Sequence, residues 1–367
     1  MQARSRIILV AAAAVALGVA VLTAAAFAVA PALDAGGTAG GPDIIGGPGT
    51  APGRFFRPRG LTSDAAGDIY NVDQTGHIQV FSPAGKVLRD WMMPAVSVGK
   101  PEGLAIDLDG NLLVADTHYS RVIRFSPEGQ ELKRWGHYGV GPGQFTYPLA
   151  VAVDRNSGRI YVSEYGQNND RVQIFTRDGE YLKGWGSFGT APGQFRRPSG
   201  LAIGPDGNIY VADAVNHRVQ VFTSEGIFVR TWGHFGSGVG ELEYPYDVAV
   251  SPANVVFVCE FGNNRIQAFT PLGQSLGWVG GTGARPGQLA TPWCVTLEPK
   301  PAGDGKIDWW VVVADTVNQR LCRWPVADVL KQGAQVLARQ SGAAGTAAAT
   351  ATAGRRPRAG SPSGGPR

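Results

Sequence analysis

The sequence is poor in charge, cysteine and histidine, and each shortage excludes a class of protein. Only 17% of the residues are charged, and the long Glu, Lys and Leu blocks of a coiled coil are missing. Three cysteines in 367 residues exclude a disulfide-stapled mini-protein. The five histidines lack the spacing of a zinc-binding helix, and there is no phosphate-binding glycine loop or Gly-x-Ser-x-Gly nucleophile motif.

The basic balance of the chain is confined to its two ends. The formal net charge is +4, but six arginines lie in residues 1–30 and 341–367, and Asp34 is the one acid outside residues 41–340. Residues 41–340 therefore carry a net charge of −1. Because nucleic-acid affinity comes largely from neutralising phosphates, no nucleic-acid partner is expected.

An uncharged, Ala-rich and Val-rich run over Ile7–Ala30 follows Arg4 and Arg6. The run is long enough to cross a bilayer as a helix, and the preceding arginines favour a cytoplasmic N-terminus. We expect residues 1–30 to form a signal anchor, which makes the chain a single-pass protein of the cell membrane with the rest outside the cytoplasm. Small-residue motifs before Pro31 leave a cleaved signal peptide, and a secreted or periplasmic product, open.

Two further segments are predicted to lie outside the folded part. Residues 31–42 are rich in Pro, Ala, Gly and Thr and are typical of a flexible linker. Residues 341–367 lack periodicity and aromatic side chains, so they cannot bury enough surface to become ordered. We expect this segment to be a disordered basic tail.

The segment between these ends contains six internal repeats. Each repeat begins at a proline before a short apolar run, and successive prolines are 43, 47, 50, 47 and 47 residues apart: Pro58, Pro101, Pro148, Pro198, Pro245 and Pro292. In the fourth repeat, short runs predict strands over Gly200–Ile203, Asn208–Asp213, Arg218–Phe222 and Ile227–Trp232. Connectors of Gly, Asp, Asn and Pro favour antiparallel strands over helices.

Six repeats of four strands predict an all-β fold, a six-bladed β-propeller over residues 43–340, preceded by the N-terminal transmembrane or signal helix. Each sheet buries its faces only against its neighbours, so the closed ring supplies the stability. In the sixth blade, Gln335–Gln340 is the expected fourth strand. Ile44 and Ile45 align with the end of such a strand as well, and the sequence leaves open which chain end supplies the outer pairing.

The repeated text resembles the NHL repeat. The fourth blade shows it as RPSGLAIGPDGNIYVADAVNHRVQVF, and the resemblance covers about residues 44–340. It implies a propeller that is used mostly as a binding platform, although some relatives are enzymes. The acidic and basic residues of each Asp-x-x-Asn-x-Arg turn, such as Asp213 and Arg218, are expected to pair with each other, because a contact repeated in every blade serves packing.

Residues that differ between blades at a repeated position are the better functional candidates. The positions after each repeat proline are expected to ring the mouth of the central channel, where the differing polar and aromatic residues are Arg59, Glu102, Ser199, Tyr246, Asp247 and Trp293. Such a mouth suits a protein loop, a peptide or a glycan. Exposed aromatics are favoured at interfaces, and the candidates are Tyr119, Tyr165 and Phe261.

The alternative is a divalent-metal lactonase, hydrolase or lyase acting in the channel. Residues 151–175 resemble propeller lyases that release amidated peptides, which implies a channel zinc held by histidines; no blade entry here carries a histidine. Propeller lactonases use acidic ligands, and Glu102 and Asp247 could offer two oxygens to Ca²⁺. Because two ligands are too few, we expect no metal or other cofactor, with a Ca or Zn ion as the alternative.

Overall fold

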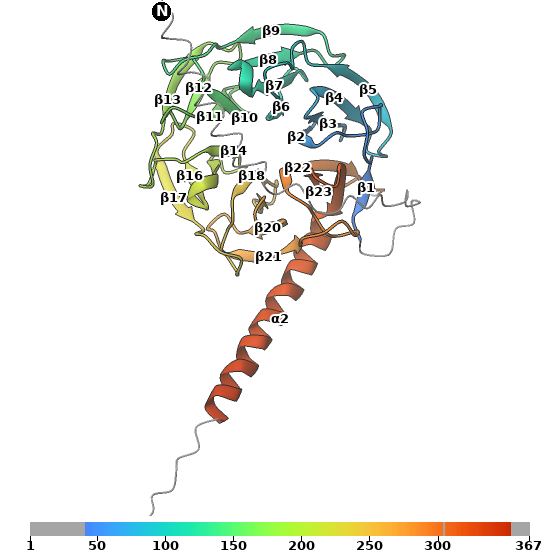
Figure 1. Cartoon of the computed structure of the whole chain (residues 1–367), viewed down its shortest axis with the longest axis vertical. Helices are drawn as coiled ribbons and strands as arrows, with labels where there is room; N and C mark the ends of the chain where they lie inside the picture. The colour runs from blue at the N-terminus through green and yellow to red at the C-terminus, as the bar shows by residue number, and fades with distance from the viewer. Residues whose placement is uncertain (1–40, 304, 354–367) are drawn as a thin grey trace, which may run out of the picture. The chain divides into compact units, whose positions relative to one another are not determined.

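The computed structural model describes residues 41–303 and 305–353, and for residues 340–353 only the backbone. Strands dominate these residues, arranged as six sheets around a centre (Figure 1). The anchor predicted over residues 1–30 lies outside the described part, as do residues 354–367 of the tail. Within the described ranges, no helix is long and apolar enough to cross a membrane.

Each of the first five sheets contains four consecutive antiparallel strands. Blade one is β2 (Pro58–Ser63), β3 (Ile69–Asp73), β4 (His77–Phe81) and β5 (Val87–Met92), and blade two is β6 (Leu104–Ile106), β7 (Leu112–Asp116), β8 (Arg121–Phe125) and β9 (Glu131–Trp135). Blade three is β10 (Tyr147–Val153), β11 (Ile160–Tyr165), β12 (Arg171–Phe175) and β13 (Tyr181–Trp185). Blade four is β14 (Pro198–Ile203), β15 (Ile209–Asp213), β16 (Arg218–Phe222) and β17 (Phe228–Trp232), and blade five is β18 (Pro245–Val250), β19 (Val256–Glu260), β20 (Arg265–Phe269) and β21 (Ser275–Gly280). Single-turn helices η2 (Thr117–Tyr119) and η3 (Ala214–Asn216) join the second and third strands of blades two and four.

Blade six draws on both ends of the described chain. Its sheet runs β22 (Pro292–Pro301), β23 (Ile307–Asp315), β24 (Arg320–Pro325) and then β1 (Asp43–Ile45), so the N-terminal strand supplies the outer position. The strand predicted at Gln335–Gln340 is wrong: these residues lie in helix α2 (Val326–Ala353). The helix also covers residues 341–353, where we expected no regular structure. Ala-rich sequence favours a helix, and β1 already fills the outer edge.

The closing strand is fixed by an arginine buried between three segments. Arg323 of β24 donates to the Asp43 carboxylate of β1, to the Glu298 carboxylate of β22 at 3.1 Å, and to the Pro83 carbonyl of blade one at 2.9 Å. Burial raises the pKa of Glu298 to about 7, against the opposing charge of Arg323 and Lys300. Blades one and six are thus held together by a buried charge cluster.

The apolar core is divided among the contacts between neighbouring blades. Between blades one and two, for example, Tyr70 and Val80 pack on Leu112 and Phe125. The tryptophan at the end of a fourth strand fills the wedge to the next blade. Trp91 lies against Gly129 of blade two, where an added Cβ would come within 2.5 Å of the indole ring, so glycine is required there.

The repeated acidic and basic residues pair as expected in five blades. The Arg Nε to carboxylate distances are 2.5–2.8 Å in the pairs Asp116–Arg121, Glu164–Arg171, Asp213–Arg218, Glu260–Arg265 and Asp315–Arg320. The acids are buried. In blade four, Arg218 also donates to the carbonyls of Thr190, Ala191 and Gln194 in the preceding Gly-rich loop. These pairs hold the loops that carry the channel mouth.

Candidate functional site

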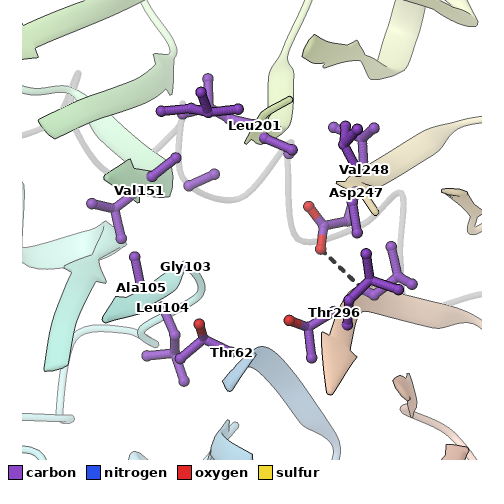
Figure 2. A pocket seen from close by; sticks show the side chains of 18 of the residues that line it. Thr62, Gly103, Leu104, Ala105, Val151, Leu201, Asp247, Val248 and Thr296 are labelled. Atoms are coloured by element: carbon purple, nitrogen blue, oxygen red, sulfur yellow. Dashed lines mark hydrogen bonds between the residues drawn. The ribbon is translucent and has the colours of Figure 1, made fainter. Parts of the chain in front are cut away.

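The first strands of the six blades enclose a central cavity of about 570 Å³. Its wall is mixed: Leu104, Val151, Leu201 and Val248 contribute aliphatic surface, Thr62 and Thr296 contribute hydroxyl groups (Figure 2), and further polar side chains line it as well. A cavity of this size that combines aliphatic surface with polar groups is suited to a small molecule or the end of a peptide.

Six side chains, one from each blade, form a chain of contacts at the mouth of this cavity. We call this set the mouth belt: Glu102, Arg59, Trp293, Tyr246, Arg197 and Tyr165. Glu102 forms an ion pair with Arg59, whose guanidinium lies 4.1 Å from the centroid of the Trp293 ring. Trp293 meets the Tyr246 ring edge-on at 4.9 Å. The belt therefore joins four residues predicted for the channel mouth, from blades one, two, five and six, and the predicted interface aromatic Tyr165 from blade three.

Arg197 continues the belt into blades three and four. Its guanidinium lies 4.8 Å from the Tyr246 ring centroid and 5.2 Å from that of Tyr165, and one Nη donates to the Tyr246 hydroxyl at 3.2 Å. Its backbone amide donates to the Asp170 carboxylate at 2.5 Å, and its φ of 59° is left-handed. Stacking on aromatic faces holds the planar guanidinium in one orientation.

Of the remaining predicted residues, Phe261 and Ser199 lie beside or below the belt, and Tyr119 does not contact it. Phe261 stacks on Tyr246 at 4.5 Å, so it supports the belt and adds to its aromatic wall. Ser199 is buried in the cavity wall, with its hydroxyl close to the Arg197 carbonyl. Tyr119 lies away from the belt, because its hydroxyl contacts the Ser97 side chain and the Val98 amide.

Positive charge predominates around the mouth, although the propeller as a whole is nearly neutral. Within the belt, Arg59 and Arg197 are opposed by Glu102, which leaves one formal positive charge. Just outside the belt, burial lowers the pKa of Lys100, and the guanidinium groups of Arg59 and Arg57 lower it further. Lys100, Arg57 and Arg59 therefore lie close enough to interact, as a group of cations beside the mouth. Such a local excess attracts anions to the mouth.

Asp247 is one of three acidic residues that line the cavity, with Glu102 and Asp154. It projects from β18 toward the cavity (Figure 2), and one oxygen accepts hydrogen bonds from the Cys294 thiol at 2.8 Å and the Val295 amide at 2.9 Å. Burial raises the pKa of Asp247 to about 6, although these donors and the Val248 amide act in the opposite direction. Near neutral pH the group can accept a proton or a hydrogen bond from a ligand.

This pKa predicts how stability depends on pH. Between about pH 4 and pH 6 the folded protein holds a proton on Asp247 that the unfolded chain has released, so raising the pH through this window destabilises the fold. Over this window the free energy of unfolding is expected to fall by about 1–3 kcal/mol. We expect Asp247→Asn to remove this part of the decrease, measured by urea unfolding at pH 4.5 and 7, whereas Glu128→Gln on the exposed surface leaves it unchanged. An unaltered decrease in Asp247→Asn would contradict the assignment.

The structure gives no metal centre from the predicted acids. Glu102 is engaged by Arg59, and Asp247 by Cys294 and Val295. Among the described residues, no three His, Cys, Asp or Glu side chains are grouped to hold a metal ion. Cys259, Cys294 and Cys322 are free cysteines, and the first and last are buried.

Sequence reasoning did not identify Arg197. It examined the position after each repeat proline, whereas Arg197 precedes Pro198. The positions before the prolines also differ between blades, from Arg57 and Lys100 to Tyr147 and Arg197. That variation was the signal that could have placed Arg197 among the candidates.

Comparison with known proteins agrees with this fold. The NHL repeat family matches residues 195–222, the core of blade four. Peptidyl-glycine alpha-amidating monooxygenase B of Xenopus laevis is 35% identical over 143 residues, 34% of this chain and 16% of that protein. The Protein brain tumor of Drosophila melanogaster is 40% identical over 65 residues, 18% of this chain and 6% of that protein. The chain thus spans less than a fifth of each relative.

Solved structures share the architecture at low sequence identity. A gluconolactonase of Xanthomonas campestris has a TM-score of 0.54 at 16% identity, with 74% of this chain and 86% of that chain covered. A streptogramin B lyase has a TM-score of 0.52 at 14% identity, with 74% and 94% covered. At this identity the likeness concerns the fold alone.

These observations define the fold and then the repeat from which it is built. Six four-stranded antiparallel sheets around a central cavity make the protein a six-bladed β-propeller. The repeated Asp-x-x-Asn-x-Arg turns, their buried ion pairs and the NHL repeat matched in blade four make it an NHL-repeat propeller.

Proposed function

We propose that this protein is a binding platform that captures a protein, peptide or glycan at the channel mouth. The observation that carries the proposal is the mouth belt, which brings two guanidinium groups and aromatic faces together above a cavity of about 570 Å³. Aromatic and arginine side chains dominate the energetics of protein interfaces. The variation of these residues between blades, beside the constant turn pairs, supports a role other than packing.

The proposal includes a location outside the cytoplasm, with the chain tethered by its N-terminal segment. The apolar run after Arg4 and Arg6 supports this location. Cell fractionation of the full-length chain tests it. Recovery in the membrane fraction, with the propeller accessible to protease added from outside, is expected; full-length chain in the cytoplasmic fraction would contradict it.

Capture of a partner tests the role of the belt. Chemical cross-linking of the wild-type propeller to extracytoplasmic extracts is expected to yield a specific partner, and Trp293→Ala is expected to reduce its recovery at least tenfold. The substitution removes two aromatic contacts, each worth about 0.5–1.5 kcal/mol beyond the buried area. Because Trp293 is only half-buried, we expect the protein to remain folded, which the melting temperature checks. Tyr138→Ala removes an aromatic side chain that is 59% exposed outside the belt and is expected to retain the partner. Equal loss in both variants would contradict the proposal.

A metal-dependent hydrolase or lyase remains the second candidate function. The names of the lactonase and lyase neighbours and the Asp247 carboxylate on the cavity wall support it. Metal analysis of the purified protein distinguishes the two functions. Stoichiometric, tightly held Ca²⁺ or Zn²⁺ that is lost in Asp247→Asn would favour the enzyme.

A further inference from the structure

Arg197 is a half-buried cation, and Glu102 acts on its charge without forming an ion pair with it. Its side chain lines the cavity between the rings of Tyr165 and Tyr246, and among the described residues no carboxylate forms an ion pair with its guanidinium. Its Nε is buried and has no hydrogen-bond partner. By contrast, the arginines of the repeated turns each meet a buried acid, as Arg265 meets Glu260. Removing a charged N–H group from water without giving it a hydrogen-bond partner is costly, so the buried Nε of Arg197 indicates a role other than stability.

We infer that Arg197 is the receptor for a carboxylate group on a ligand with an apolar body. This inference rests on the proposed function, because it names the chemical class that the channel mouth takes. A guanidinium presents parallel N–H donors that match the two oxygens of a carboxylate. The Tyr165 and Tyr246 rings lie 5.2 and 4.8 Å from the guanidinium, and one Nη already donates to the Tyr246 hydroxyl, so a ligand is bound by the remaining N–H donors.

The charge of the mouth favours a carboxylate over a dianionic phosphate. Within the belt, Arg59 and Arg197 together exceed Glu102 by one positive charge, which a single carboxylate neutralises. Asp247 on the wall below adds a negative charge as the pH rises above about 6, and this disfavours a dianion further. A dianion would leave an excess negative charge beside Glu102, whose side chain is only 10% exposed, and repulsion between poorly solvated charges is strong. Lys100 and Arg57, further out, attract an anion toward the mouth without contributing a second buried partner.

The cavity explains why the rest of the ligand is apolar. Below the belt, aliphatic side chains such as Leu104, Val151 and Leu201 form a continuous part of the wall, beside polar groups that include Asp247 and Thr296. Tyr246 and Trp293 line the entrance to the same cavity. A group attached to the carboxylate therefore meets aromatic and aliphatic surface, and burying it is favourable in proportion to its apolar area.

Two sources can provide this chemistry, a free small carboxylic acid or the C-terminus of a peptide. We would titrate the full chain with 3-phenylpropanoate and with N-acetyl-Ala-Phe, each compared with its uncharged primary amide, by isothermal titration calorimetry. Both acids are expected to bind, and each amide at least tenfold more weakly. A tighter dipeptide acid identifies a peptide C-terminus as the source, and a tighter 3-phenylpropanoate identifies a small acid.

Three variants separate the role of Arg197 from a general effect of charge. Arg197→Gln is expected to abolish the preference for acid over amide. Arg196→Gln is the matched control, because this neighbouring arginine is exposed and stacks on Phe188 outside the cavity; it should keep the preference. Glu102→Gln removes the opposing charge and is expected to tighten binding of the acids three- to tenfold, with the amides unchanged.

These measurements can overturn the inference on their own. Equal affinity for acid and amide, or no binding of either acid by the wild type, would overturn it, as would a retained preference in Arg197→Gln. If Arg197→Gln fails to fold, the affinity of Glu102→Gln for the acids tests the inference instead. Tighter binding of the acids would support it, and weaker binding would contradict it. The proposed platform is tested separately: loss of the captured partner in Trp293→Ala can persist even when the carboxylate assignment fails.

Discussion

Replacing Arg265 with alanine is expected to destabilise the propeller by about 3–5 kcal/mol, because it leaves a buried carboxylate without its partner. The Arg265 side chain is 4% exposed and the Glu260 side chain is fully buried, with Nε and Oε1 2.5 Å apart. Arg265 also donates to the carbonyls of Ser237, Gly238 and Glu241. The variant thus loses an ion pair and leaves loop carbonyls unsatisfied. The expected loss is a large part of the free energy of unfolding of a typical domain, which is about 5–15 kcal/mol.

Urea unfolding at neutral pH measures this effect, and two further variants define its cause. Arg134→Ala breaks an exposed pair with Glu131, so a loss of less than about 1 kcal/mol is expected. Glu260→Gln added to Arg265→Ala removes the unpaired charge and should restore part of the stability. A loss in Arg265→Ala no larger than that in Arg134→Ala would show that the buried pair is not a major source of stability.

Removing β1 is expected to open the ring. A chain that begins at residue 47 lacks the strand that pairs Asp43 with Arg323 and Ile45 with Leu321. It also loses Ile45 from the core between blades six and one. Burial of one isoleucine contributes about 1.5–3 kcal/mol, and the exposed edge of β24 invites pairing with other chains.

A chain that begins at residue 41 is the matched control, since it keeps every described strand. We expect it to unfold at the temperature of the full chain, whereas the shorter chain unfolds at a temperature lower by at least several degrees and associates on size-exclusion chromatography. Equal melting temperatures for the two chains would show that blade six is stable without its outer strand.

The internal repeat made most of the fold predictable. The predicted strands of blade four match β14–β17 to within two residues, because short apolar runs between Gly, Asp and Asn turns leave little freedom of register. The pairing of Asp213 with Arg218 followed from the same repetition. Six equivalent copies provide the same local rule six times, so the blades could be derived from composition and spacing.

The sequence was least informative where the repetition stops. Gln335–Gln340 contains residues that fit a strand or a helix, and its state depends on which chain end occupies the edge of β24. In the fold, Val329 is fully buried and packs with the core between blades five and six. A Cβ at Gly277 of β21 would lie 2.1 Å from the Gly333 carbonyl, so α2 and this strand meet closely. Such long-range contacts leave no mark in the local sequence.

The candidate site was predictable in composition but not in geometry. Reading one position per blade gave Arg59, Glu102, Tyr246 and Trp293, which the structure brings into one belt. Arg197 joins them from the position before its proline, with a left-handed backbone that an L-residue seldom adopts. Its orientation depends on Tyr165 and Tyr246 from the two neighbouring blades, so it follows from ring assembly and cannot be read from blade four alone.

The pairing of β1 with β24 has a consequence for biosynthesis. A ribosome produces β1 first among these strands and β24 last, so blade six remains incomplete until translation has passed Pro325. Until then, β1 has no native neighbour and blades one to five present an unfinished end. The nascent chain must therefore be kept from associating with other chains for most of its synthesis. Blade six, and with it the ring of blades, is complete only when β24 has emerged and paired with β1.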